Sequence, residues 1–281
     1  MRGRAVCKIC ASMAQERFRA TVLGRHHVAY YCCESCGFMQ TEEPYWLPEA
    51  YSNSITASDT GSLLRSLFLA ELASVILYCF YDRDAKYLDF AGGYGLFARR
   101  MRDIGFDFYW RDAYSPNLVA RGFEYAEELG RIELITSFES FEHFSEPIAE
   151  IERMLAISRN IIFTTELLPD PIPTPEQWYY YGLHHGQHIS FYSERTMRYI
   201  ADKYNLRYCS SNSLHFLSDK PLAPTTLSFL TSLRRFGLFL YVKRRMTSRT
   251  VLDSVELTNR AMDTHRQSAE DPEVRVDKSH S

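Results

Sequence analysis

The stretch from Tyr87 to Ala98 constrains the fold of this chain more than any other, because an apolar run leads directly into a glycine-rich turn and a helical pattern. Glycines in such a turn let the backbone approach a ligand that a Cβ atom would exclude. The first turn of the following helix offers free N–H donors. The sequence therefore predicts a strand, a turn and a helix that together bind a nucleotide-like cofactor.

The acidic residue at the end of this strand bears on which cofactor binds. Asp89 would repel a pyrophosphate above the turn, whereas it would attract a cationic ligand. The spacing of Gly93, Gly95 and Ala98 also fits the dinucleotide fingerprint, with Asp112 as the acid that binds the ribose. The turn alone leaves both cofactor classes open, so an NAD(P)-dependent oxidoreductase is the alternative interpretation.

Length and composition describe an ordinary globular chain. Its 281 residues, 46% of them hydrophobic, are enough for one sizeable α/β domain and a small module. The 32 basic and 35 acidic side chains give a net charge of −3, so no nucleic-acid partner is expected. The N-terminus leads to cysteines rather than to an apolar signal core, and we expect a cytoplasmic protein.

Two Cys-x-x-Cys pairs lie near the N-terminus, and their spacing is typical of a tetrahedral zinc site with the ligands Cys7, Cys10, Cys33 and Cys36. Cys32 is the competing ligand, but the Cys-x-x-Cys register favours its neighbour. Two strand-like runs, 18–23 and 28–31, separate the pairs and predict a zinc ribbon over residues 1–40. A closed site of this kind is structural. Cysteines that merely pack and a nucleic-acid-binding ribbon are the alternatives.

The rest of the chain alternates strand and helix patterns, which predicts a doubly wound, mostly parallel α/β sheet with ligands at the carboxyl ends of its strands. The expected strands are 86–90, 106–110, 131–138 and 160–165, and the expected helices are 62–80, 95–104 and 146–156. We expect a connector and helix at 41–80, with the connector near the cofactor mouth, and the sheet domain at 81–220. A basic helical extension at 221–265 and a disordered tail at 266–281 would follow.

One connection is unusually short. Too few residues separate Asp112 from Arg131 to hold both a strand and a crossover helix. We therefore expect the strand after Asp112 to be missing or rudimentary, and with it the acid that would contact an adenine.

Several of these motifs resemble those of class I S-adenosylmethionine-dependent methyltransferases, over roughly residues 5 to 215. The turn after Asp89 matches their first motif, with Ala91 in place of the first glycine, and the run Phe138–His143 resembles their Phe-Glu-x-x-Glu-His element. The resemblance extends to bacterial sugar and natural-product methyltransferases with an N-terminal zinc-binding module. It implies a Rossmann-like methyltransferase sheet and S-adenosylmethionine contacts from Asp89, Ala91, Gly93, Gly95, Asp112 and Glu139.

A proline-rich and aromatic segment at 166–192 has the composition of a site for a polyhydroxylated ligand, where rings stack and polar tips select. The resemblance places a Gly-x-His segment on the substrate side, here Gly186 to His188. We expect the substrate to contact Trp178, Tyr180, Gln187 and His188. A metal cluster of His184, His185 and His188 is the alternative.

Methyl transfer to a hydroxyl or a carbon acid needs a base, and His143 and His188 are the candidates. We expect methyl transfer by in-line displacement to a small polar acceptor, with a sugar or glycoconjugate intermediate as the favoured class. Besides the oxidoreductase, a zinc-ribbon binding protein with a degenerate methyltransferase fold stays open.

The stretch from Thr226 to Arg249 is basic, without an acid, and carries many apolar residues. A basic amphipathic helix of this kind can lie on an anionic membrane as a peripheral contact. A helix packed on the domain with a solvated basic face is the alternative, and the one that we favour.

Overall fold

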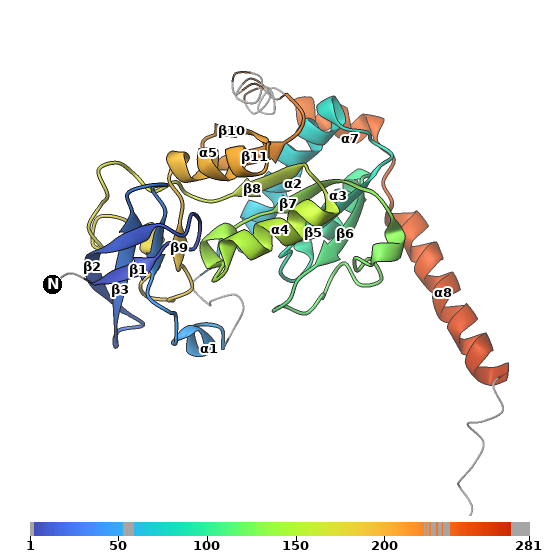
Figure 1. Cartoon of the computed structure of the whole chain (residues 1–281). Coiled ribbons are helices and arrows are strands. Elements are labelled where there is room, and N and C mark those ends of the chain that lie inside the picture. The colour runs from blue at the N-terminus through green and yellow to red at the C-terminus, as the bar shows by residue number, and fades with distance from the viewer. Residues whose placement is uncertain are drawn as a thin grey trace, which may run out of the picture.

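The computed structural model describes residues 3–52, 59–221, 223, 225, 229, 232 and 237–270, with side chains up to residue 263. It contains two sheets (Figure 1). The larger sheet has six strands in the order β10-β11-β8-β7-β5-β6, and the smaller has five in the order β1-β2-β3-β4-β9.

The six-stranded sheet confirms the predicted fold class. Its strands are β5 (Lys86–Phe90), β6 (Asp107–Arg111), β7 (Ile132–Ser137), β8 (Ile161–Thr164), β10 (Arg207–Ser211) and β11 (Leu214–Ser218). Strands β6, β5, β7 and β8 are parallel neighbours, while β11 runs antiparallel to β8 and to β10. The central strands β7 and β8 are buried along their whole length. This agrees with the almost entirely apolar sequence of β8, whereas β7 also buries Glu133, Thr136 and Ser137.

Helices cover both faces of this sheet. One core joins buried residues of α2 (Ser62–Phe80), α3 (Leu96–Ile104) and α7 (Leu238–Arg245), and a second joins those of α4 (Pro147–Ile157) and α5 (Glu194–Lys203). Helix α2 is long and apolar enough to cross a membrane, but Ala70, Val75 and Ile76 are fully buried in the first core. Packing therefore explains the apolar composition of its second half, whereas Leu63, Leu64, Leu67 and Phe68 in its first half are exposed.

The small sheet forms the N-terminal module. Its antiparallel strands are β1 (Arg4–Val6), β2 (Met13–Val22), β3 (His26–Cys33) and β4 (Met39–Thr41), followed by the short helix α1 (Leu47–Ala50). The hairpin β2–β3 contains both strand-like runs of the sequence analysis.

The fifth strand of this sheet comes from far along the chain. Strand β9 (Ser190–Phe191) pairs with β4, and Trp178, Tyr181 and Phe191 share a core with Tyr30 of β3. The proline-rich and aromatic segment lies within the predicted sheet domain in sequence, but it packs against the N-terminal module. The predicted units 1–40 and 81–220 are joined here, which the sequence did not indicate.

The connection after β6 agrees with the prediction of a rudimentary strand. A single parallel bridge joins Trp110 to Glu124, and a short 3₁₀ turn at Glu127–Leu129 follows. Strand β6 is the last strand on this side of the sheet.

The C-terminal region contains α7 and α8 (Thr250–Glu270). Helix α7 covers only part of the stretch for which one basic helix was predicted, and it buries Phe239 and Val242 while its basic last turn is exposed. Most of residues 222–236 lie outside the described residues, so membrane contact stays a prediction. Helix α8 continues to residue 270, which corrects the start of the predicted tail; residues 271–281 lie outside the described part.

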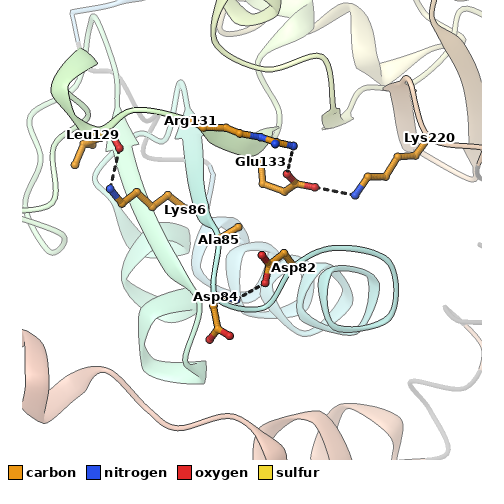
Figure 2. A pocket seen from close by; sticks show the side chains of 8 residues that line it. All are labelled: Asp82, Asp84, Ala85, Lys86, Leu129, Arg131, Glu133 and Lys220. Atoms are coloured by element: carbon orange, nitrogen blue, oxygen red, sulfur yellow. Dashed lines mark hydrogen bonds and ion pairs between the residues drawn. The ribbon is translucent and has the colours of Figure 1, made fainter.

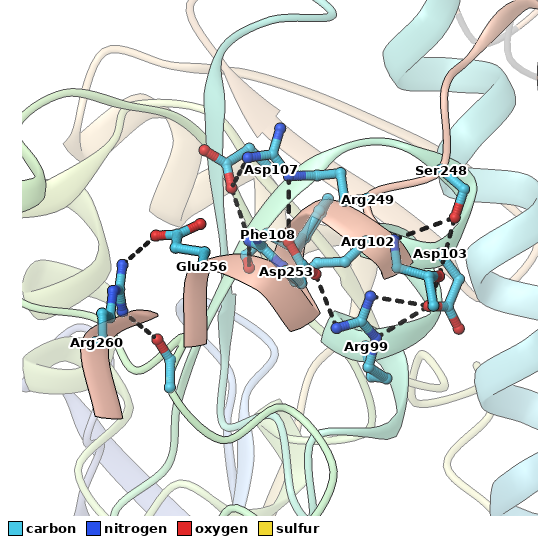
Figure 3. A network of polar contacts seen from close by, with 12 residues as sticks. Arg99, Arg102, Asp103, Asp107, Phe108, Ser248, Arg249, Asp253, Glu256 and Arg260 are labelled. Carbon is cyan, nitrogen blue, oxygen red and sulfur yellow. Dashed lines mark hydrogen bonds and ion pairs between the residues drawn. The ribbon is translucent and has the colours of Figure 1, made fainter. Parts of the chain in front are cut away.

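A buried ion-pair network holds the start of α8 against the sheet domain (Figure 3). The Arg102 guanidinium, 1% exposed, donates to both carboxylate oxygens of Asp253 at 2.8 Å and to Asp107 at 2.6 Å. Arg99 also contacts Asp253 at 2.8 Å. Burial alone would raise the pKa of Asp253, but the bonds from these two arginines hold it below its usual value.

We predict that Asp253→Ala lowers the free energy of unfolding by about 3–5 kcal/mol, because it leaves Arg102 charged and buried without its main partner. Glu256→Ala is the matched control, since it removes an exposed ion pair with Arg260 on the same helix and should cost at most about 1 kcal/mol. Urea unfolding measures both, and equal losses would contradict the assignment of the network as a buried tether.

Candidate functional site

The polar residues singled out by the sequence follow the carboxyl ends of three neighbouring parallel strands. Asp89 is the penultimate residue of β5, Asp112 directly follows β6, and Glu139 comes two residues after β7. Because β6, β5 and β7 are adjacent and parallel, these ends meet at one edge of the sheet. This is the edge at which open α/β sheets bind ligands.

The glycine turn after β5 has the conformation that a close ligand approach requires. Ala91, Gly93 and Gly95 all have positive φ, at 56°, 54° and 86°. A Cβ atom on Gly93 would meet nothing within 4 Å, so this part of the turn faces open space. On Gly92, in contrast, a Cβ would lie 2.5 Å from Asp89 Oδ2 and 2.8 Å from Trp110 Cδ1. The turn is packed on its inner side and open on its outer side.

Asp89 is 2% exposed, and only one of its oxygens is satisfied. Thr136 Oγ1 donates to Oδ1 at 2.9 Å, while Oδ2 has no hydrogen-bond partner among the described residues. Burial raises the pKa of this carboxyl to about 8, and the nearby Asp112 adds to the rise. A buried carboxyl oxygen without a partner beside an open turn is what a cationic ligand would complete.

Asp112 organises the turn from the neighbouring strand. Its Oδ2 accepts a bond from the Gly93 N–H at 2.9 Å, and its Oδ1 accepts from the N–H groups of Tyr114 and Ser115, both at 2.7 Å. The carboxylate is half-buried and keeps lone pairs for a diol. Asp112 therefore stands where the sequence analysis placed it, next to the turn.

Glu139 is held in an unusual backbone conformation, with a φ of +50°. Its Oε1 accepts a bond from Thr164 Oγ1 at 2.7 Å at the end of β8, and Arg65 of α2 lies 3.7 Å from its Oε2. A non-glycine residue at positive φ stores strain, which proteins retain mostly at functional sites. Glu139 thus joins the same edge, with one oxygen tied to the sheet and the other to α2.

The two predicted catalytic histidines lie side by side although they are far apart in sequence. The ring centroids of His143 and His188 are 4.9 Å apart. His143 Nδ1 lies 3.1 Å from the carbonyl oxygen of Gln187, and His188 Nδ1 lies 2.6 Å from that of Tyr180. Burial lowers the pKa values of His143 to about 4 and of His188 to about 3, so both rings are neutral near pH 7.

Tyr51 connects this histidine pair to the cofactor edge, although no sequence motif pointed to it. Its hydroxyl lies 2.9 Å from His143 Nδ1, and its ring stacks on that of Tyr114 with the centroids 6.0 Å apart. Tyr114 follows Asp112 and is 80% exposed. The connector after α1 therefore lies at the mouth of the site, as expected, but the residue that makes the contact was not predicted.

The predicted substrate residues differ in what they contact. Trp178 is buried in the core of the N-terminal module, which favours a packing role. Tyr180 is also buried and supplies the carbonyl that anchors His188, while Gln187 Nε2 donates to the Ala50 carbonyl at 2.8 Å. Tyr179 between the two aromatics is 76% exposed and contacts Glu166, so it is the accessible ring of this run.

The four cysteines of the two predicted knuckles converge. Their sulfur atoms all lie within 4.8 Å of one another, with Cys7 and Cys36 3.5 Å apart and Cys10 and Cys33 3.4 Å apart. The residues after the knuckles, Ala11 and Gly37, both have positive φ. Their N–H groups donate back to the carbonyls of the first cysteines.

Cys32 lies outside this cluster and packs in the core of the N-terminal module instead. The structure therefore brings Cys33, rather than Cys32, to the other three cysteines. Four converging thiols with matched turns fit a tetrahedral metal ion.

A separate depression lies at the opposite edge of the sheet (Figure 2). It is lined by the amino ends of β5 and β7, and three of its charges are paired with one another: Glu133 contacts Lys220 at 2.7 Å and Arg131 at 2.9 Å. Ligands of such sheets bind at the carboxyl ends. We therefore assign the functional site to the edge with Asp89.

Comparison with known proteins identifies the family of the domain that carries this edge. A family model described as a methyltransferase domain matches residues 64–211, just over half of the chain. This match includes the glycine turn and all the polar residues at the carboxyl edge. No curated protein matches the sequence significantly.

Several solved structures are similar at low identity. Magnesium protoporphyrin IX methyltransferase (ChlM) from Synechocystis PCC 6803 is 10% identical with a TM-score of 0.38, over 63% of this chain and 96% of that one. The plantazolicin methyltransferase BpumL is 14% identical with a TM-score of 0.45, over 71% and 85%. The mitomycin 7-O-methyltransferase MmcR is 12% identical with a TM-score of 0.39, over 61% and 59%.

We predict that Gly92→Ala lowers the free energy of unfolding by about 1–3 kcal/mol, because the added methyl group overlaps the Asp89 carboxylate and the Trp110 ring. The control is Gly61→Ala at the start of α2, where the added Cβ meets only the flexible end of Arg65 and should cost less than about 1 kcal/mol. Chemical denaturation compares the two variants, and a neutral Gly92→Ala would contradict the tight inner side of the turn.

Proposed function

Because the chain belongs to the methyltransferase domain family and is an S-adenosylmethionine-dependent methyltransferase, we propose that it methylates a hydroxyl group of a small polar acceptor. A sugar or glycoconjugate intermediate is the acceptor class that we favour. The observation that carries the proposal is the juxtaposition, at one edge of the sheet, of a turn suited to the cofactor and a half-buried pair of neutral histidines. The family excludes the oxidoreductase alternative.

The residues at the carboxyl edge fit the cofactor. We assign the positively charged end to Asp89, whose Oδ2 lacks a partner, the backbone approach to Ala91, Gly93 and Gly95, and the ribose hydroxyls to Asp112. Glu139 closes the same edge beside Arg65. The missing strand after β6 removes the usual place for an adenine ligand, so we assign no residue to the adenine.

When bound, the cofactor supplies a methyl group attached to a cationic sulfur, and the sulfur keeps the electron pair of the carbon–sulfur bond that breaks. The acceptor oxygen forms the new bond to carbon, and its proton must leave. We place His143 and His188 at this hydroxyl, because both rings are neutral. They promote the loss of the proton either as a base, as the sequence predicts, or as ligands of a cation.

Support for a polyhydroxylated acceptor comes from the two accessible rings of the region. Tyr179 and Tyr114 are largely exposed. Partial burial and the negative charge of Glu139 both contribute to the raised pKa of Tyr179, and the Asp112 carboxylate accepts a bond from the Tyr114 N–H. Aromatic faces of this kind stack on the apolar faces of sugar rings, while neighbouring polar groups select the hydroxyls. Trp178 and Tyr180, which the sequence analysis predicted as substrate contacts, are buried and would support this surface from beneath.

We predict that binding of S-adenosylmethionine releases a proton from Asp89, whose pKa of about 8 in the free protein must fall when a cation binds beside it. Affinity should therefore rise with pH, by up to about tenfold per pH unit below pH 8. Calorimetry in buffers of different ionisation enthalpy measures the proton, with NAD⁺ as a ligand that should not bind. The same pH dependence in Asp89→Asn would contradict the assignment.

We predict that His188→Ala lowers the rate of S-adenosylhomocysteine formation by about 10²- to 10⁴-fold, while the affinity for S-adenosylmethionine is unchanged. The assay offers sugars and nucleotide sugars with free hydroxyls as acceptors. His184→Ala is the matched control, because this exposed histidine lies four residues earlier in the same segment. Failure of every sugar to accept a methyl group would reject the acceptor class, and full activity of His188→Ala would reject the role of the histidine.

We further propose that the four converging cysteines bind a structural zinc ion. The adjacent cysteines provide an unusually close control. Cys33→Ser should lose one equivalent of zinc and destabilise the N-terminal module, whereas Cys32→Ser should keep the metal, because its sulfur packs in a core away from the cluster. Elemental analysis of the purified variants measures the difference, and equal zinc contents would contradict the ligand assignment.

A further inference from the structure

A second group of side chains with the chemistry of metal ligands lies at the functional edge. One carboxylate oxygen of Glu142 and one ring nitrogen each of His143 and His188 all lie within 4.8 Å of one another. Two of these residues are adjacent in sequence, and the third comes from the segment that precedes β9. The group is separate from the four cysteines.

The hydrogen bonds of the two histidines indicate which nitrogen is available to bind an ion. Each ring places Nδ1 near a backbone carbonyl, that of Gln187 for His143 and that of Tyr180 for His188. A carbonyl oxygen only accepts, so a hydrogen bond to it places the proton on Nδ1 and leaves Nε2 with a lone pair. Nδ1 of His143 has the Tyr51 hydroxyl as a second neighbour, at 2.9 Å. Metal-binding histidines are held in this way, with one nitrogen on a carbonyl and the other on the ion.

Glu142 completes the arrangement. Its side chain is 1% exposed, and its Oε2 has no hydrogen-bond partner within the part of the chain that the structure describes. A buried carboxylate oxygen without a donor is costly, and an imidazole nitrogen without a proton is an acceptor as well. Acceptors from one buried carboxylate and two half-buried histidines, this close together, require a proton or a cation between them.

We propose that Glu142, His143 and His188 bind a divalent transition-metal ion with open coordination positions for the acceptor. Two imidazoles and one carboxylate form a donor set used by catalytic zinc and non-haem iron sites. The inference rests on the proposed function for its last step only, the binding of the acceptor hydroxyl to the ion. Metal binding itself does not depend on that step.

This set differs from the histidine cluster that the sequence offers as an alternative. His184 is exposed, and His185 Nδ1 accepts a bond from the Gln187 N–H at 3.1 Å. The ring of His185 lies against that of His188, with the centroids 4.7 Å apart, but it is not one of the three converging groups. No carboxylate lies next to His188 in the sequence. In the structure Glu142, which comes much earlier in the chain, supplies it.

The position of the ion suits a role in methyl transfer. His143 contacts Tyr51, whose ring stacks on Tyr114 beside Asp112, so the ion lies next to the cofactor edge. A cation lowers the pKa of a bound hydroxyl and orients its oxygen. An acceptor hydroxyl bound to the ion would therefore pass its proton to solvent water. No free histidine would be needed as the base.

Metal stoichiometry tests the proposal on the full chain. The purified protein is stripped with a chelator, loaded with Zn²⁺ or Mn²⁺, freed of unbound ion by gel filtration and analysed for bound metal. We expect two equivalents of zinc in the unmodified protein and in His184→Ala. Glu142→Gln and His188→Ala should each retain one equivalent, and Cys33→Ser should retain the other, so that Glu142→Gln combined with Cys33→Ser retains none.

Two further readouts separate the possible failures. The rise in melting temperature with S-adenosylmethionine should persist in Glu142→Gln and His188→Ala, which shows that these variants fold and still bind the cofactor. One equivalent or less in the unmodified protein with both ions, or two in Glu142→Gln, would overturn the metal site and leave the proposed function intact. Loss of cofactor binding in the unmodified protein would instead reject the proposed function, whatever the metal content.

Discussion

The pairing of β9 with β4 is the contact on which the functional site depends. Only Ser190 and Phe191 form the strand, yet they attach the segment after β8 to the N-terminal sheet. His188 lies directly before this strand, and the neighbouring Ile189 N–H donates to the Glu142 carbonyl at 2.9 Å. The same few residues therefore hold the N-terminal module, the histidine pair and the loop after β7 together.

The N-terminal module consequently serves the site in addition to folding around its cysteines. Thr196 Oγ1 donates to the Cys36 carbonyl at 2.9 Å, so the second knuckle is fastened to the start of α5 on the sheet domain. From the other end of the module, the connector brings Tyr51 to His143. A metal in the cysteine cluster would stabilise the strands from which both contacts extend, and thus the distance between His143 and His188. The module and the catalytic edge form one structural unit.

Sequence reasoning succeeded where the signal is local. The turn after Asp89, the choice of Cys33 over Cys32 and the rudimentary strand after Asp112 each follow from spacing within a short stretch, and the structure agrees with all three. It failed where the outcome depends on packing between distant segments. Trp178 and Tyr180 have the composition of a sugar site, but the N-terminal sheet buries them, and no local pattern reveals a partner sheet so much earlier in the chain. Tyr51, and the approach of Glu142 to His188, were missed for the same reason.

Two buried carboxyl groups at this edge, those of Asp89 and Glu142, share one electrostatic problem. Each has an oxygen without a hydrogen-bond partner among the described residues, and each is almost fully buried. Elsewhere in this protein a buried acid is matched by arginine, as Asp253 is by Arg102 and Arg99. Evolution of a stable fold alone would favour the same solution, or an apolar residue, at the other two positions. Positive charge from bound ligands resolves both cases: the cationic end of the cofactor at Asp89, and a metal ion at Glu142. The two ligands would then lie at adjacent strand ends, which places the methyl donor and the activated acceptor within reach of one another.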